Sequence, residues 1–116
     1  MRFTQPLRQN RDFRRLYAKG RSAVTPVLAG YSRKNKSGQN RLGITVSPKV
    51  GNAVVRNRVR RRIREAYRTR EEMFLSGYDI VIVARVRAAS ARYDEISDAI
   101  CRLARELRLM KENEQK

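Results

Sequence analysis

The 116-residue chain contains no histidine and no tryptophan, and Cys101 is its single cysteine. A lone cysteine cannot form an intramolecular disulfide, and the lack of histidine excludes imidazole catalysis and zinc sites built from cysteine and histidine. Cys101 follows Ile100 on an apolar helical stripe, so we interpret it as a small core residue. Glycine-rich phosphate loops and nucleophile-elbow motifs are also missing. We therefore expect no catalytic residue in this chain.

Long apolar runs are missing as well. No segment approaches the roughly 18 apolar residues of a membrane span. The first twenty residues are basic but have neither the apolar region nor the cleavage site of a secretory signal, so we expect a cytoplasmic protein. The length fits one domain over residues 1–116, with residues 112–116 frayed at the C-terminus.

Acidic residues are scarce in the first 70 positions, which hold 20 Lys and Arg against 2 Asp and Glu. Residues 71–116 hold 8 basic and 9 acidic side chains, so the first 70 residues carry a net charge of +18 and the remainder −1. Solubility requires a net charge of only about 2–8. The excess indicates a polyanionic partner. A membrane surface is disfavoured because the apolar helix faces are needed for the core.

Hydrophobic periodicity predicts six elements in the order αββαβα, which is an α+β fold built as a two-layer sandwich. The first two strands flank the turn KNKSGQN and are expected to form an antiparallel pair. The β-branched run YDIVIVA is typical of a central strand that is covered on both faces. The predicted helices are 10–20, 52–69 and from Ser90 or Arg92 to Met110, and the predicted strands are 24–33, 42–47 and 78–84.

The second predicted helix is dominated by arginine. Eight of the seventeen residues from Val54 to Arg70 are arginine, and only Glu65 is acidic. At about 100° per residue, the apolar side chains share one arc and most of the arginines lie opposite. A solvated face normally mixes charges of both signs, whereas arginine alone favours forked contacts to phosphate. This face predicts nucleic-acid binding without distinguishing DNA from RNA. A helix that recognises DNA bases in the major groove is disfavoured, because arginine at nearly every polar position would contact phosphates more than base edges.

Aromatic residues suggest a second nucleic-acid surface. Phe13 and Tyr17 lie one turn apart on the first helix, and Tyr31 lies on the first strand, all among basic residues. They form a candidate stacking platform for single-stranded bases, although packing in the core is an equally good interpretation of Phe13. The neighbouring strand face is small and polar enough to leave room for a groove at Gly43, Thr45 and Ser47.

The segment Leu42–Arg68, LGITVSPKVGNAVVRNRVRRRIREAYR, closely resembles the signature of the bacterial ribonuclease P protein component. DFRRLYAKGRS at 12–22 and YDIVIVAR at 78–85 follow in the order that the family has. The resemblance implies the protein subunit of a ribonucleoprotein endonuclease that removes the 5′ leader from precursor tRNA, with catalysis in the RNA subunit. It also implies a small mixed sheet with a left-handed βαβ crossover, against the usual right-handed rule.

Carried over residue by residue, the resemblance implies two binding surfaces. The catalytic RNA would contact Arg56, Asn57, Arg58, Arg60, Arg61 and Arg64, and Arg68 continues the same face. The single-stranded leader would lie in a cleft between the sheet and the first helix, at Phe13, Tyr17, Tyr31, Thr45, Ser47 and Lys49. Pro48 stands where the family commonly has a basic residue, so one cleft charge is missing and Ser47 is restricted to extended backbone.

The expected partners are the catalytic RNA and precursor tRNA, with no membrane and with the protein itself monomeric. The resemblance implies magnesium bound mainly by the RNA subunit and substrate, no metal site on the protein and no organic cofactor. By bridging two polyanions, the protein would raise substrate affinity and lower the magnesium requirement. The alternative is a small basic ribosomal protein, which would share the arginine helix but need no aromatic cleft. An autonomous nuclease would need carboxylates in the basic part of the chain, which has only Asp12 and Glu65.

Overall fold

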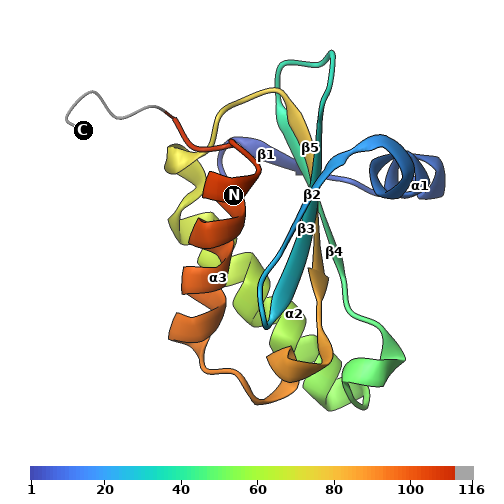
Figure 1. Ribbon diagram of the computed structural model, residues 1–116, viewed down its shortest axis with the longest axis vertical. Helices are drawn as coiled ribbons and strands as arrows, with labels where there is room; N and C mark the ends of the chain where they lie inside the picture. The colour runs from blue at the N-terminus through green and yellow to red at the C-terminus, as the bar shows by residue number, and fades with distance from the viewer. Residues whose placement is uncertain (112–116) are drawn as a thin grey trace.

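The apolar run Tyr78–Ala84 forms β5, the central strand of a five-stranded mixed sheet in the computed structural model, which describes residues 1–111 (Figure 1). The strand order is β1-β4-β5-β3-β2. β5 runs parallel to β4 and antiparallel to β3, and its residues Ile80, Val81 and Ile82 are buried. The predicted central strand is therefore confirmed. The other strands are β1 (Thr4–Pro6), β2 (Arg21–Val24), β3 (Leu28–Lys34) and β4 (Asn40–Thr45).

The predicted antiparallel pairing of strands 24–33 and 42–47 is wrong. β3 and β4 flank the turn as expected, but β5 lies between them and pairs with both. The physical reason is that β5 is apolar on both faces, so the middle of the sheet buries more of its surface than an edge would. The predicted strand 24–33 is also divided. Thr25 turns the chain between β2 and β3, where its Oγ1 accepts a hydrogen bond from the Leu28 backbone N–H at 2.9 Å.

Three helices lie close to their predicted ranges, at α1 (Asn10–Lys19), α2 (Ala53–Thr69) and α3 (Tyr93–Glu106). Asn52 caps α2 by accepting a hydrogen bond from the Val55 backbone N–H at 3.0 Å. α1 starts one residue after its cap, which is Gln9 rather than the predicted Asn10. α3 ends before the predicted Met110 because the backbone turns at Arg108, whose φ is 60°. Leu109 then accepts a hydrogen bond from the Leu75 backbone N–H, and Met110 pairs with Phe74.

The sheet and helices α2 and α3 form the two main layers, as Figure 1 shows, and the predicted α+β class is confirmed. Successive residues of β4 face opposite sides of the sheet. Leu42 and Ile44 pack into the core beneath α2 and α3, whereas Gly43 lies against Phe13 of α1 on the opposite face. α1 covers that face over a smaller cluster centred on Leu16 and Val81. Short 3-10 turns complete the described chain at η1 (Pro48–Val50), η2 (Glu71–Met73) and η3 (Val86–Ser90).

β4, α2 and β5 form a βαβ unit of parallel neighbouring strands. The left-handed crossover implied by the resemblance stays a prediction. None of the described helices is long and apolar enough to cross a membrane. The predicted fraying of residues 112–116 lies outside the described residues.

Candidate nucleic-acid interface

The arginines of α2 divide into two groups with different partners. The first group, the outer arginine face, makes side-chain hydrogen bonds only within α2 and its N-terminal approach. Arg56 donates to the Gly51 carbonyl at 3.3 Å, Arg60 donates to Asn57 Oδ1 at 3.3 Å, and Arg68 forms a forked, exposed ion pair with Glu65. Arg61 and Arg64 are exposed. This face contains Arg56, Asn57, Arg60, Arg61, Arg64 and Arg68.

The second group, the inner arginine row of Arg58, Arg62 and Arg70, binds α2 and its C-cap to α3 and to the segment that leads into α3. Arg58 Nη2 donates to the Ala89 carbonyl at 3.3 Å, and Arg62 Nη1 donates to the Ala91 carbonyl at 2.8 Å. Arg70 Nε donates to Ser97 Oγ at 3.0 Å. Arg58 and Arg62 lie one turn apart on α2, and Arg70 is the residue that follows the helix. Within the described residues, Arg58 Nε is buried without a hydrogen-bond partner.

Arg58 therefore stands apart from the other residues predicted to contact the catalytic RNA. Part of its guanidinium is already used inside the protein, and its RNA contact stays a prediction. Sequence reasoning missed the structural role of Arg62 and Arg70. For Arg62 the available signal was its position on the border of the apolar arc, where a long side chain can reach a neighbouring element. Arg70 projects over the apolar arc itself, at the C-terminal end of α2.

The aromatic residues predicted to form a platform do meet on the opposite face of the sheet. The Tyr17 and Tyr31 rings are 4.9 Å apart in an edge-to-face arrangement, and the Phe13 and Tyr17 rings are 6.5 Å apart. We call Phe13, Tyr17 and Tyr31 the aromatic trio. Tyr17 is 43% exposed, so a base can reach it. Its hydroxyl lies 3.2 Å from Thr45 Oγ1, which brings that predicted cleft residue to the same place.

Gly43 provides the space in which Phe13 lies. A Cβ atom at this position would be 2.5 Å from Phe13 Cζ, which is closer than side-chain atoms approach. Only glycine therefore allows α1 to lie this near to β4 without movement of the ring. The sequence indicated a small strand face here but not its contact with Phe13.

Ser47 and Lys49 lie farther along the chain, in a second basic region. Ser47 has the extended backbone that Pro48 predicts, and its Oγ accepts a hydrogen bond from the Lys49 backbone N–H at 3.3 Å. Both residues line a hollow of about 320 Å³ beyond the ends of β4 and β5, together with Arg85 and Arg87. These two arginines were missed because they lie singly in the sequence, outside any charged run.

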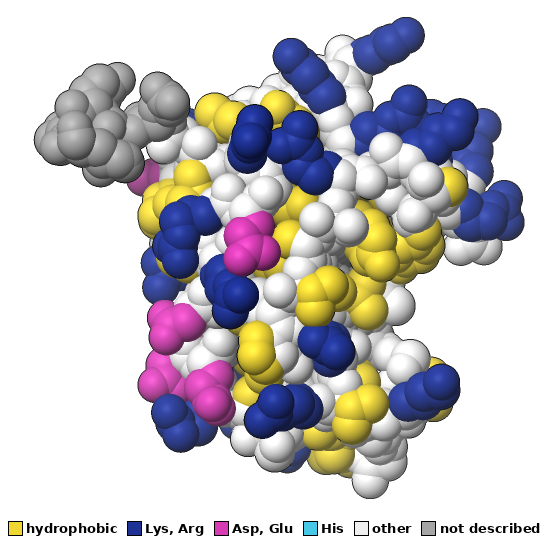
Figure 2. Space-filling view, viewed as in Figure 1, with side chains coloured by type: hydrophobic (Ala, Val, Ile, Leu, Met, Phe, Trp, Pro, Cys, Tyr) yellow, Lys and Arg dark blue, Asp and Glu magenta, His cyan; other side chains and the backbone are white. Residues whose placement is uncertain are grey.

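Figure 2 shows how charge is distributed over one side of the molecule. Lys and Arg gather over α1, whereas Asp and Glu lie on the side of α3. The surface is hollowed between α1 and the region of η1, and hydrophobic side chains border this hollow. The basic and acidic side chains, which are unevenly distributed along the sequence, are therefore also separated on the surface.

An ionic network fastens α1 and β4 to the central strand. Arg41 forms a forked pair with Asp79 at 2.8 and 2.7 Å, and its Nη1 lies 3.5 Å from Asp12 of α1. Burial acts to raise the pKa of Asp79, but hydrogen bonds from Arg41 and Asn35 outweigh it and leave that pKa below its ordinary value. The charged carboxylate thereby helps to hold the helix that carries Phe13 and Tyr17.

The described residues do not fit a protein-bound magnesium ion. Residues 1–111 contain no group of three or more Asp, Glu or Cys side chains that could hold a metal. Magnesium prefers oxygen ligands in octahedral geometry and retains several waters. We therefore assign no step to a metal held by this chain, and magnesium bound by the RNA partners stays a prediction.

Comparison with known proteins agrees with these features. Residues 1–108 match the family model of ribonuclease P. The ribonuclease P protein component of Alkaliphilus metalliredigens is 42% identical over 110 residues, which cover 95% of this chain and 99% of the relative. That of Clostridioides difficile is 46% identical over 103 residues, which cover 88% of this chain and 90% of the relative.

Solved structures support the same relationship. The RNase P protein of Staphylococcus aureus matches with a TM-score of 0.83 at 31% identity, covering 96% of this chain and all of that chain. The protein from Thermotoga maritima matches with a TM-score of 0.78 at 29% identity, covering 87% and 96%. The alternative of a ribosomal protein is disfavoured, since sequence and fold agree nearly end to end that this chain belongs to the ribonuclease P protein family.

Proposed function

We propose that this protein binds the catalytic RNA of ribonuclease P with the outer arginine face and the single-stranded 5′ leader of precursor tRNA with the aromatic trio. The observation that carries the proposal is the placement of these two surfaces on opposite faces of one sheet. Each face can then hold a different RNA strand. The protein thus acts as a cationic bridge between two polyanions.

The outer arginine face suits the phosphates of a folded RNA. Guanidinium groups donate forked hydrogen bonds to phosphate oxygens, and each neutralised phosphate releases condensed counterions. Arg61 and Arg64 are exposed, and the hydrogen bonds of Arg56 and Arg60 are long at 3.3 Å. Little internal bonding has to be broken before these side chains turn to an RNA. Contact with RNA also relieves the repulsion among arginines spaced four residues apart.

The aromatic trio suits unpaired bases. Stacking on an aromatic side chain is sequence-tolerant and contributes about 1–3 kcal/mol per base. A leader differs in sequence from one precursor tRNA to another, so recognition by stacking rather than by base edges is the appropriate chemistry. Thr45 adds a hydroxyl to the same place, and Ser47 and Lys49 extend the proposed path toward Arg85 and Arg87.

Catalysis in this proposal belongs to the RNA partner, where magnesium supplies the metal chemistry. The protein contributes by holding substrate and catalytic RNA together and by replacing diffuse counterions with fixed arginines. The proposed consequences are higher substrate affinity and a lower magnesium requirement. We propose that it acts in the cytoplasm and enters the complex as a monomer.

Cleavage of a 5′-extended precursor tRNA by a bacterial ribonuclease P RNA tests this function. At low magnesium, addition of the protein is expected to restore cleavage. Tyr31→Ala is expected to raise KM for a substrate with a leader while leaving affinity for the catalytic RNA unchanged. If the protein binds RNA but does not stimulate cleavage, the proposal is contradicted and a ribosomal RNA-binding role is favoured instead.

A further inference from the structure

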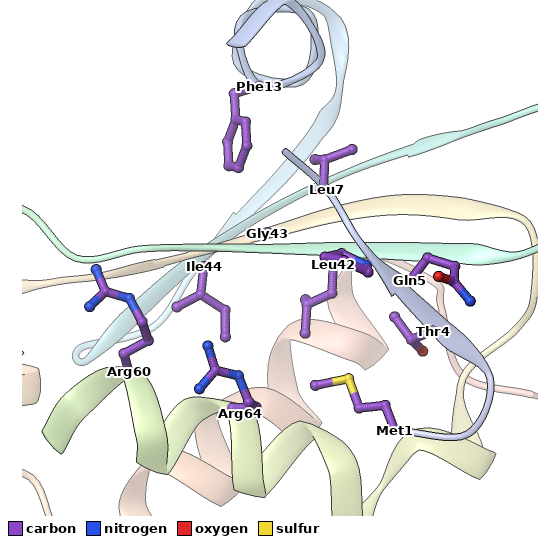
Figure 3. A pocket seen from close by; sticks show the side chains of 11 residues that line it. Met1, Thr4, Gln5, Leu7, Phe13, Leu42, Gly43, Ile44, Arg60 and Arg64 are labelled. Atoms are coloured by element: carbon purple, nitrogen blue, oxygen red, sulfur yellow. The ribbon is translucent and has the colours of Figure 1, made fainter. Parts of the chain in front are cut away.

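A pocket of about 360 Å³ lies at the open edge of β4, between the two surfaces described above (Figure 3). We call it the edge pocket. Leu7 and Phe13 border it on the α1 side, Gly43 and Ile44 form its strand wall, and Arg60 and Arg64 approach from α2. It is therefore reached by one residue of the aromatic trio and by two residues of the outer arginine face.

The edge is open because β1 pairs with only part of β4. The last paired residues are Pro6 and Leu42, and Leu7 donates its backbone N–H to the Leu42 carbonyl at 2.9 Å. The chain then turns away toward α1. In a parallel ladder, alternate residues direct both backbone groups to the same neighbour. Ile44 lies two residues after Leu42, so its N–H and carbonyl face the open edge. Within residues 1–111 we find no hydrogen bond to either group.

The arginines supply positive charge at this edge. Figure 3 shows the Arg60 and Arg64 side chains extending from α2 toward β4. Arg60 makes one long hydrogen bond, to Asn57 at 3.3 Å, and Arg64 makes none with another described residue. Two nearby guanidinium groups repel each other, and an anion between them removes that repulsion. A phosphate is the anion that fits an RNA-binding protein.

The rest of the wall is apolar. Leu7 and Phe13 offer an apolar surface for a flat ring on the α1 side of β4, and the Ile44 N–H offers one hydrogen bond at the strand edge beside it. Unstacked bases in RNA are commonly recognised by apolar or aromatic contact together with hydrogen bonds to their edges. The volume lies near the lower end of the range of about 300–1,000 Å³ for small-molecule sites, which suits one nucleotide rather than a longer strand.

We propose that the edge pocket binds one unstacked nucleotide of an RNA partner, with its phosphate between Arg60 and Arg64 on the α2 side of β4 and its base against Leu7 and Phe13 on the α1 side, beside the open backbone groups of Ile44. This inference rests on the proposed function, because the nucleotide comes either from the catalytic RNA or from the leader. The site differs from the aromatic trio in lying at the strand edge and in drawing its charge from α2.

Titration of the isotope-labelled protein with adenosine 5′-monophosphate tests the pocket by NMR. The backbone amides of Ile44 and Gly43 are expected to shift in a saturable way. Arg64→Gln is expected to raise the dissociation constant at least about tenfold, because it removes a charge-assisted contact to phosphate. Arg105→Gln, an equal change of charge on the exposed side of α3, is the matched control and is expected to leave the binding unchanged.

Adenosine and inorganic phosphate serve as the two partial probes. Each is expected to bind more weakly than the nucleotide, since each lacks half of the proposed contacts. Equal effects of phosphate and nucleotide would overturn the base contact. Equal effects of Arg64→Gln and Arg105→Gln would overturn the phosphate site and show only general attraction to a cationic protein.

Crosslinking in the assembled complex identifies the source of the nucleotide. A benzophenone side chain placed at Gln5, on the rim of the pocket, is expected to react with a single nucleotide of the catalytic RNA or of the leader. The same group at Ser22, on the opposite edge of the sheet, is the control. Stimulated cleavage without a crosslink from Gln5 would overturn the edge pocket while leaving the proposed function intact. Absence of stimulation would overturn the proposed function itself.

Discussion

At the scale of single residues, the cleft depends on the contact between Gly43 and Phe13. The glycine matters here because of space rather than backbone freedom. A methyl group at this position has no room beside the Phe13 ring, and both residues belong to elements that are fixed on other sides. The ring must therefore move if the glycine is replaced.

We expect Gly43→Ala to displace Phe13 and to weaken leader binding by about tenfold, on the scale of one lost stacking contact. Affinity for the catalytic RNA is expected to fall less than affinity for the leader, because α2 lies on the other face and Phe13 contributes to at most one nucleotide of that RNA, in the edge pocket. Fluorescence titration with leader-containing and leaderless precursor tRNA measures the difference. The displaced ring is also expected to lower the thermal stability of Gly43→Ala. Adding Phe13→Leu, with its smaller side chain, is expected to restore that stability but not leader binding. An equal loss of affinity for both substrates would contradict this account.

Neighbouring arginines also differ sharply at this scale. Arg61 is exposed, whereas Arg62 donates to the Ala91 carbonyl at 2.8 Å. We expect Arg61→Gln to leave the free energy of unfolding nearly unchanged and to reduce the salt dependence of catalytic RNA binding by about 0.7–0.9 in log–log slope. Arg62→Gln is expected to lower the free energy of unfolding by about 1–2 kcal/mol instead. Urea denaturation and filter binding at several salt concentrations separate the two effects. The reverse assignment would show that the inner arginine row is not structural.

At the scale of elements, the short strand β1 depends on a carboxylate from another part of the chain. Glu71 accepts hydrogen bonds from the backbone N–H groups of Arg2 and Phe3 at 3.0 and 2.9 Å, and Thr4 Oγ1 lies 2.9 Å from the Tyr67 hydroxyl. A three-residue strand has too few ladder bonds to hold itself in place. Glu71 therefore helps to keep the N-terminal wall of the edge pocket in position.

This carboxylate predicts a dependence of stability on pH. Burial acts to raise the pKa of Glu71, but the hydrogen bonds that it accepts outweigh burial and leave that pKa below its ordinary value. A lowered pKa in the folded state means that the stabilisation is present at neutral pH and is lost as pH falls through the folded-state pKa. Glu71→Gln is expected to cost about 1–3 kcal/mol at pH 7 and progressively less below about pH 4. Unfolding of both proteins across pH measures this. A constant difference would contradict it.

The elements show what periodicity can and cannot predict. The helices and β5 were found because each contains enough apolar residues for a clear repeat, whereas β1 has only three residues and no such signal. The pairing of β5 between β3 and β4 depends on contacts distant in sequence, which local patterns do not contain. Likewise, the arginine helix and the aromatic trio were predictable from residue types. The division of the arginines and the edge pocket depend on Ala89, Ala91 and the course of β1, which only the fold brings near.

At the scale of the whole molecule, one thin sheet separates the two proposed RNA surfaces. The outer arginine face belongs to the layer of α2, and the aromatic trio lies under α1 on the other side. Substitutions at distant sites that share no contact usually have additive free energies. A bridge built in this way should therefore bind its two partners independently.

The double variant Tyr31→Ala with Arg61→Gln tests this independence. We expect its loss of kcat/KM at low magnesium to equal the product of the two single losses within about a factor of two, which is the usual scatter of additive sites. Raising magnesium is expected to recover the Arg61→Gln loss more than the Tyr31→Ala loss, since cations can replace a charge at a phosphate but cannot replace a stacked ring. A measured loss for the double variant that differs tenfold from the product of the single losses would contradict independence. It would mean that the leader and the catalytic RNA meet across the edge of β4, where the edge pocket joins the two surfaces.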